Sequence, residues 1–292
     1  MTNGFYLNLT EAAMSYKTIL VHLDRKDILK NRVRIAANLA RTEGAHLLGV
    51  AMIGISPQSF YSAQINVKDP VLVAHLNFLR DKAGKFVEEF KNEVGSLGLP
   101  SYEGRVVDGE ASDGISLLGR TTDLIVIGRT NLDDKGASVT PDFPEFVMMN
   151  SGRPVLIIPP NYPKETVGKK AMICWNASRE SIRAVVDALP LLKRADLVQI
   201  VMYNIDDEAD MDTSVAGTDI AEYLGRHGVN VEVLPPQKSR KVGTSLLELA
   251  TEQGTDLLVM GGYGHTRFRE FLLGGVTRTI LEETEIPVLM SH

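Results

Sequence analysis

The chain has 292 residues, 44% of them hydrophobic and 23% charged, and this length favours two globular domains over one. Lys and Arg number 31 against 37 Asp and Glu, which gives a formal net charge of −6 and a pI of about 5.6. An acidic chain lacks the basic surface that attracts nucleic acids and anionic membranes, so we expect neither as a partner. The single cysteine, Cys174, excludes an intramolecular disulfide and a cysteine metal cluster.

The amino-terminal residues MTNGFYLNLTEAA lack the basic start and apolar core of a signal peptide. They precede a second methionine, Met14, which is a candidate start of the functional chain. No apolar run approaches the roughly 18 residues that span a bilayer. We therefore expect a cytoplasmic protein.

The first half alternates predicted strands and helices. The strand LIVIG is apolar throughout, which is typical of a parallel strand that is buried on both faces of its sheet. The stretch 54–75 has no counterpart of equal length later in the chain, and it forms either a surface loop or a cover over a cleft. Strands are expected near 17–23, 45–52, 102–107, 123–127 and 154–158, and helices near 30–43, 70–97 and 111–120.

The second half repeats this alternation after a linker rich in proline and polar residues, PPNYPKETVG (159–168). Ser178 is the expected N-cap of a helix that ends near Leu192, and Gly228 and Gly254 are expected to end two later helices. The expected strands are 170–175, 197–203, 229–234, 256–260 and 287–290, and the other helices are 218–227, 244–253 and 275–283.

The two halves form an internal repeat. Residues 122–128, TDLIVIG, match residues 255–261, TDLLVMG, and the same spacing of 133 aligns two later Pro-Val-Leu segments. Near the starts of the halves, 17–24 matches 169–176 at a spacing of 152. Duplication followed by one insertion explains both spacings.

The repeat predicts an α/β protein of two tandem doubly wound, Rossmann-like domains, at 14–160 and 168–292. Each domain is expected to contain a five-stranded, mostly parallel sheet flanked by helices.

Candidate binding residues follow the strand 256–260, in GGYGHTRFREFLLGGVT. Ligands of doubly wound folds bind beyond the carboxyl ends of the strands, where this loop lies. Its glycines let backbone amides approach a phosphate, and the amides that begin the next helix favour an anion. The candidate residues are Gly261, Tyr263, Gly264, His265, Gly274, Gly275, Val276 and Thr277, the last adding a hydroxyl donor.

This loop resembles that of the universal stress protein family, whose nucleotide-binding members carry Gly-x2-Gly-x9-Gly-Ser/Thr ahead of Val-Thr. The resemblance extends through both repeats and implies ATP or another adenine nucleotide, with or without Mg²⁺. Gly261, Gly264 and Gly274 match the motif, whereas Gly275 stands where the family has Ser or Thr. The amide remains and one hydroxyl contact is lost, so we expect weaker binding or an altered phosphate preference.

The resemblance also implies that the residue closing the first strand lies near the ribose. The family has aspartate there and this half has Asn176, which can bond a hydroxyl but brings no charge to a metal. By the same analogy the backbone of Met202 and Tyr203 borders the adenine. For Cys174, Trp175 and Met202, packing in the core is the competing interpretation.

The corresponding loop of the first half is broken. The spacing of 133 places Asn131, Pro141 and Asp142 opposite three of the loop glycines. Proline has no amide to donate, and a carboxylate repels a phosphate. Asp24 keeps the family's aspartate but cannot hold a nucleotide alone, so we predict that this half has lost ATP binding.

We expect no dedicated catalyst, because no nucleophile elbow, Walker sequence or zinc spacing is present. Slow hydrolysis of bound ATP, which needs only Mg²⁺ and a positioned water, stays open. The first hypothesis is a stress-response or signalling protein whose nucleotide state is read by an unknown protein partner. The second is a nucleotide-independent adapter of the same fold. The third is an enzyme such as an ATP pyrophosphatase or an electron-transfer flavoprotein, against which stands the missing SGGxD-type loop.

The family resemblance further implies that such domains pair through their last strands. Here these strands are 154–159 and 287–292, so the tandem is expected to form an intrachain pseudo-dimer. A homodimer of two chains stays open.

Overall fold

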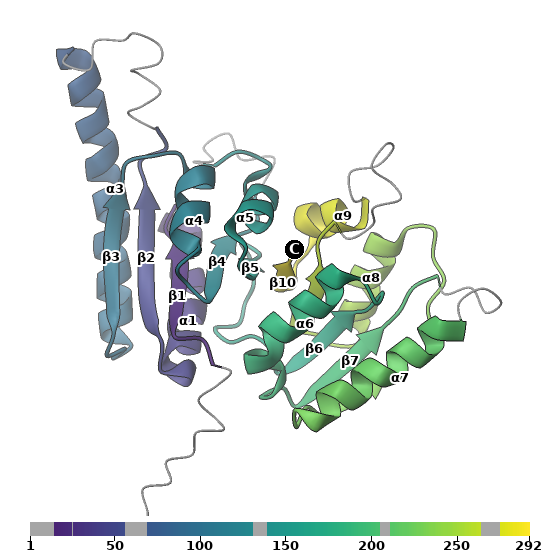
Figure 1. The fold of residues 1–292 in the computed structure, drawn as a ribbon. Coiled ribbons are helices and arrows are strands. Elements are labelled where there is room, and N and C mark those ends of the chain that lie inside the picture. The colour runs from purple at the N-terminus through teal and green to yellow at the C-terminus, as the bar shows by residue number, and fades with distance from the viewer. Residues whose placement is uncertain (1–14, 25, 56–68, 131–138, 205–210, 264–274) are drawn as a thin grey trace, which may run out of the picture.

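The structure, a computed structural model, describes residues 15–24, 26–55, 69–130, 139–204, 211–263 and 275–292 (Figure 1). Its strands form one ten-stranded sheet in the order β3-β2-β1-β4-β5-β10-β9-β6-β7-β8. Neighbouring strands are parallel everywhere except at the central pair, β5 and β10. The predicted α/β fold, with five mostly parallel strands from each half, is confirmed.

The elements follow the predicted alternation of strand and helix. The first half contributes β1 (Thr18–His22), α1 (Lys26–Glu43), β2 (His46–Met52), α3 (Pro70–Ser96), β3 (Tyr102–Val107), α4 (Ala111–Gly119), β4 (Leu124–Gly128), α5 (Phe143–Ser151) and β5 (Val155–Ile158). The second half contributes β6 (Lys170–Cys174), α6 (Arg179–Leu192), β7 (Leu197–Val201), α7 (Met211–Arg226), β8 (Val231–Val233), α8 (Val242–Glu252), β9 (Leu257–Gly261), α9 (Gly275–Glu283) and β10 (Val288–Ser291).

One helix, α5, was not predicted. Its first turn contains Pro144, and proline costs no hydrogen bond at that place in a helix. Gly152, in the left-handed region at φ 67°, ends the helix. The spacing of 133 sets α5 opposite α9, so the repeat itself contained the missing signal.

Helices cover both faces of the sheet, and each face buries its own apolar cluster. On β1, Ile19 and Val21 point to the face that α1 and α3 cover, and Leu20 points to the face of α4 and α5. In the second half α6 and α7 continue the first cluster, and α8 and α9 continue the second. The core therefore runs through both halves on both faces.

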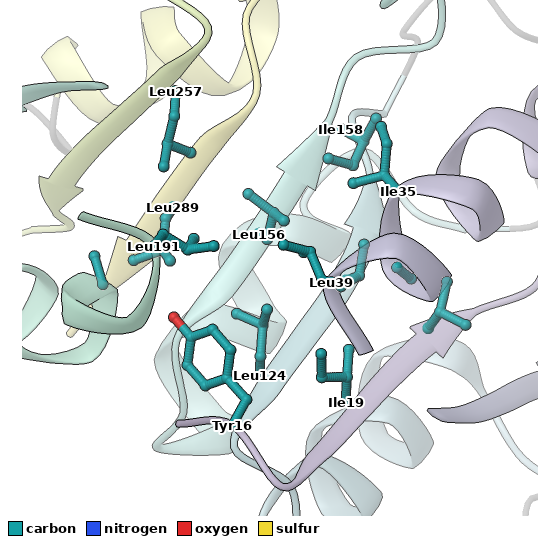
Figure 2. Packing of buried hydrophobic residues seen from close by; sticks show 14 of the residues in the cluster. Tyr16, Ile19, Ile35, Leu39, Leu124, Leu156, Ile158, Leu191, Leu257 and Leu289 are labelled. Carbon is teal, nitrogen blue, oxygen red and sulfur yellow. The ribbon is translucent and has the colours of Figure 1, made fainter. Parts of the chain in front are cut away.

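The two halves join through β5 and β10, as the family resemblance implied. Leu156 and Leu289 face each other in register at the middle of this antiparallel pair. Both side chains are fully buried in the first cluster, which Leu191 and Leu257 of the second half and Tyr16 of the first also enter (Figure 2). The antiparallel pairing turns the carboxyl ends of the two sets of strands to opposite edges of the sheet.

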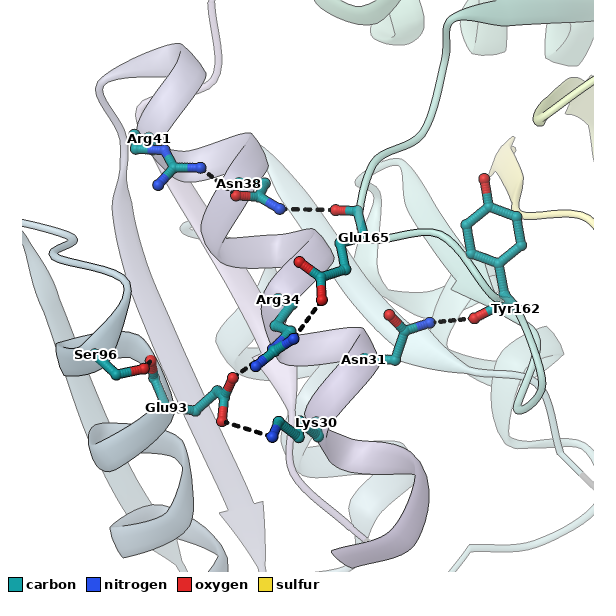
Figure 3. A network of polar contacts seen from close by, with 9 residues as sticks. All are labelled: Lys30, Asn31, Arg34, Asn38, Arg41, Glu93, Ser96, Tyr162 and Glu165. Atoms are coloured by element: carbon teal, nitrogen blue, oxygen red, sulfur yellow. Dashed lines mark hydrogen bonds and ion pairs between the residues drawn. The ribbon is translucent and has the colours of Figure 1, made fainter.

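The linker 159–168 is held against α1 by polar contacts (Figure 3). Asn38 donates to the backbone carbonyl of Glu165 at 2.8 Å, and Asn31 donates to that of Tyr162. Arg34 pairs with Glu165 and with Glu93 of α3. These contacts fix the path of the chain from β5 to β6.

None of the helices in the described ranges combines the length and the hydropathy of a bilayer-spanning segment.

Candidate functional site

The structure brings the ends of three strands together in the second half. β6 pairs with β7 on one side and with β9 on the other, all parallel, so their carboxyl ends lie at one edge of the sheet. The candidate residues that follow these strands, 174–176, 202–203 and 261–263, therefore gather at that edge. Gly264, His265 and Gly274 lie outside the described residues.

Backbone strain marks this same edge. Ala177, Asn204 and Tyr263, which follow β6, β7 and β9, have φ values of 56°, 55° and 56°. They are the non-glycine residues with positive φ among those that the structure describes. A side chain in this left-handed region costs roughly 1–2 kcal/mol per residue, and such strain concentrates at functional sites. Sequence reasoning missed Ala177, whose residue type gives no sign of a positive φ, and Asn204, although asparagine adopts the left-handed region more readily than most residues.

The candidate side chains divide between the two faces of the sheet. Those of Cys174, Tyr203, Tyr263 and Val276 pack against the cluster beneath α8 and α9. Burial raises the pKa of the Cys174 thiol to about 12, so the thiol is neutral at physiological pH. Burial also raises the pKa of Tyr203 to about 12, with smaller contributions from Cys174 and Glu248.

Trp175 and Met202 point to the opposite face, beneath α6 and α7. Met202 is 4% exposed, and a Cβ built at Gly217 of α7 would lie 2.6 Å from its Cε, so the two elements pack closely. The Trp175 amide donates to the Val201 carbonyl at 2.9 Å, whereas the buried indole Nε1 has no acceptor among the described residues. A buried donor without a partner costs about 1–3 kcal/mol, which marks the indole as a group that an incoming acceptor would stabilise.

Asn176 shapes the turn between β6 and α6. Its Oδ1 accepts from the amide of Ser178 at 3.2 Å, while the residue itself is exposed. The Ser178 Oγ accepts from the amide of Ser181 at 3.1 Å, so the predicted N-cap is confirmed. The turn thus presents Asn176 to solvent at the carboxyl edge of β6.

Packing leaves little room for a side chain at the first two loop glycines. A Cβ built at Gly261 would lie 2.5 Å from the carbonyl carbon of Glu180 and 2.6 Å from the amide nitrogen of Ser181, in the first turn of α6. A Cβ built at Gly262 would lie 2.5 Å from the Sδ of Met148, which belongs to α5 of the first half. The start of the loop is therefore held between α6 and the other half.

Polar contacts also tie the loop and α9 to the first half. The Tyr263 hydroxyl lies near the carboxylate of Glu145 on α5, close enough for that carboxylate to act on its ionisation. Burial and then the charge of Glu145 hold the pKa of Tyr263 above its usual range. Arg129, which follows β4, donates to the backbone carbonyl of Glu282 at the end of α9, and its Nη2 lies 3.4 Å from the carboxylate of Glu285.

The helix α9 begins at Gly275, as the sequence predicted. Its first amides have no partner within the helix and carry the positive end of the helix dipole. Gly275 is exposed, and a Cβ built there meets no atom of the described residues within 4 Å. Thr277, by contrast, is only 4% exposed, so its side chain is largely shielded from solvent.

The equivalent place in the first half is built differently. Asp142 stands at the N-cap of α5. Its carboxylate therefore lies where a bound phosphate would accept hydrogen bonds from the first amides of the helix. The ring of Phe143 is buried with its centroid 5.0 Å from that of His22. Asp24 accepts from Arg32 Nη2 at 2.8 Å, and although burial opposes ionisation, Arg32 and His22 hold the net pKa of this carboxyl below its usual value.

Known proteins with similar sequences support this architecture. Residues 168–292 match the model of the Universal stress protein family. Universal stress protein Slr1230 of Synechocystis sp. is 26% identical over 222 residues, which cover 71% of this chain and 71% of that protein. Universal stress protein MJ0577 of Methanocaldococcus jannaschii is 36% identical over 45 residues, which cover 15% of this chain and only 28% of that protein.

Among solved structures, a universal stress protein from Archaeoglobus fulgidus has the same fold, with a TM-score of 0.73 at 15% identity over 96% of this chain and 97% of that one. The joined sheet, its central antiparallel pair and the carboxyl-edge loops define a tandem doubly wound α/β protein. The second half of the chain matches the universal stress protein family, and the two Rossmann-like halves are consistent with the tandem type of that family.

Proposed function

We propose that the second half binds an adenine nucleotide, ATP, at the carboxyl edge of β6, β7 and β9, and that a protein partner reads this nucleotide state in stress signalling. The observation that carries the proposal is the strain at Ala177, Asn204 and Tyr263, three left-handed residues that follow three adjacent strands. Such strain persists only where the surrounding structure holds it, and ligand sites are where it concentrates.

The start of α9 supports a site for the phosphates. Its free amides and helix dipole favour an anion, and the open space around Gly275 leaves room for one. In this proposal Gly261, Gly264 and Gly274 let the loop reach the phosphates. The indole Nε1 of Trp175 is a buried donor close to the same edge, available to a ligand acceptor.

The two halves are proposed to differ in function. We take 14–160 and 168–292 as the domains and assign the nucleotide to the second. In the first, Asp142 at the start of α5 would face a phosphate with a like charge. One ATP per chain is therefore expected.

We assign no catalytic residue, and the proposed role of ATP is that of a bound ligand. Among the described residues no group of three or more His, Cys, Asp or Glu side chains could hold a metal ion. Mg²⁺, where it accompanies ATP, would thus be held chiefly by phosphate oxygens.

The experiment transfers the carboxylate of the first half into the second. Gly275→Asp recreates the Asp142 arrangement at a position where an added Cβ meets no atom of the described residues, and Gly275→Asn is the control of equal size without charge. ATP is titrated, with and without Mg²⁺, by calorimetry and by the fluorescence of Trp175.

We expect saturable binding to the unmodified chain, clear weakening in Gly275→Asn and a further loss of about tenfold or more in Gly275→Asp, because a like charge near a phosphate costs more than lost space. Equal affinities of the two variants for ATP would show that no phosphate lies at the start of α9. Binding to none of the three proteins would favour the nucleotide-independent adapter.

A further inference from the structure

A separate cavity lies in the first half, at the opposite edge of the sheet from the proposed ATP site. Its volume is about 190 Å³, and it opens where β1 and β2 end. Leu23 and Ile53 supply its apolar floor, and Leu79, Ala83 and Phe86 of α3 supply one wall. The cavity therefore combines this apolar wall with polar residues, is reached from solvent, and lies at the place where doubly wound folds bind ligands.

Two polar side chains in this cavity have unused hydrogen-bonding capacity. His22 is 2% exposed, and its Nδ1 has no hydrogen-bond partner among the described residues. That nitrogen lies 3.9 Å from Asp24 Oδ2, which is too far for a direct hydrogen bond. The other oxygen of Asp24 is taken by Arg32 at 2.8 Å. One oxygen atom placed between His22 and Asp24 could bond to both.

The charges inside the cavity are already compensated. Asp24 is paired with Arg32, so the carboxylate offers little to a second cation. Burial lowers the pKa of His22 to about 4, against the opposing charge of Asp24, and the ring is neutral at physiological pH. Lys82 also lines the cavity but is exposed to solvent. Beside His22 and Asp24, away from Lys82, a charged ligand group would lose its hydration next to charges that are already paired, which favours an uncharged group there.

Size limits the ligand further. A buried apolar cavity of about 150 Å³ holds one benzene molecule, so a cavity somewhat larger holds one ring with a small substituent. We propose that the first half binds a small uncharged monocyclic alcohol or phenol, whose hydroxyl bridges His22 Nδ1 and Asp24 Oδ2 and whose ring lies between the ends of β1 and β2 and α3. This site is independent of the ATP site proposed for the second half.

The first test uses three probes of nearly equal shape on the intact chain. Benzyl alcohol has the ring and the hydroxyl, toluene lacks the hydroxyl, and benzoate replaces it with a charge. Binding is followed by NMR through the ring signals of His22, assigned with a His22→Gln variant. We expect benzyl alcohol to shift these signals saturably, and toluene and benzoate to bind about tenfold or more weakly, because each leaves a buried polar group unpaired or adds an uncompensated charge.

Equal binding of toluene would overturn the hydroxyl bridge. Tighter binding of benzoate than of benzyl alcohol would show that the cavity binds anions. If none of the three probes shifts the His22 signals saturably, the cavity is not a binding site for such ligands.

The second test fills the cavity. Ala83→Leu adds apolar volume within it, whereas Lys85→Leu adds a leucine at an exposed position of the same helix. Circular dichroism checks folding. We expect Ala83→Leu to lose at least about tenfold in affinity for benzyl alcohol and Lys85→Leu to keep the affinity within about twofold.

Unchanged affinity in a folded Ala83→Leu protein would show that the probe binds elsewhere. If this variant does not fold, the NMR titration of the unmodified chain with the three probes decides whether the cavity binds the alcohol. ATP binding in the second half should be unaffected by Ala83→Leu, so this proposal and the ATP proposal can fail separately.

Discussion

Gly261→Ala should destabilise the chain through α6 as well as through the loop. The added Cβ would lie 2.5 Å from the carbonyl carbon of Glu180, about 0.9 Å short of the 3.4 Å at which ordinary contact begins. The atoms in its way are backbone, so the first turn of α6 must move as a unit. Overpacking of this kind costs about 1–3 kcal/mol, and a backbone obstacle belongs at the upper end.

Gly262→Ala is the matched control. Its Cβ would meet Met148 Sδ at 2.5 Å, an equally close approach, but to the end of a flexible side chain that can turn away. The expected cost is about 1 kcal/mol or less. Urea unfolding followed by the fluorescence of Trp175 reports on the second half, and midpoints are compared at unchanged slope.

We expect Gly261→Ala to lower the unfolding free energy by clearly more than Gly262→Ala does. Equal costs in the two variants, or a neutral Gly261→Ala, would refute the assignment of Gly261 to packing against α6. That glycine would then be required by the ligand alone.

Three further outcomes are expected. Gly275→Ser should raise ATP affinity about tenfold over Gly275→Ala in calorimetry, since a hydroxyl bonded to a charged group contributes about 1.5–3 kcal/mol; equal affinities would deny it a phosphate contact. The folded-state pKa of His22 is lowered to about 4, whereas the unfolded chain protonates near 6.5, so stability present above pH 6.5 is lost as the pH falls towards 4. His22→Gln should flatten this part of the stability curve, and an unchanged slope in urea midpoints would contradict the assignment. A double-mutant cycle of Tyr263→Phe and Glu145→Gln should give a coupling of about 1 kcal/mol in urea unfolding, and zero coupling would mean that the contact contributes nothing.

The repeat made most of the fold predictable. Apolar strands such as LIVIG and LLVMG, at fixed spacing, set the number and direction of strands in each half, and the structure places them in one sheet. The pairing of β5 with β10 came from the family resemblance, because two short apolar strands do not reveal their partners. The helix α5 was missed because the segment with Pro141 and Asp142 was considered only as a lost phosphate loop, although proline in a first turn, as at Pro144, is compatible with a helix.

The candidate site was predictable only in part. The spacing of the loop glycines located the edge and the start of α9, but residue types could not say which side chains share a face. The structure separates Trp175 and Met202 from Cys174 and Tyr203 because successive residues of a strand point to opposite faces.

Two kinds of feature gave no signal in the sequence. One is the left-handed backbone at Ala177, which depends on the turn and not on the residue type. The other is the contact of Tyr263 with Glu145, which requires the two halves to be assembled.

The most direct test of the account is the number of ATP molecules bound per chain. Calorimetry should give one site in the unmodified chain, one site in Asp24→Ala, and loss of that site in Gly275→Asp. This result would place ATP in the second half alone. Two sites per chain, or a single site lost in Asp24→Ala and kept in Gly275→Asp, would contradict the account by placing nucleotide in the first half.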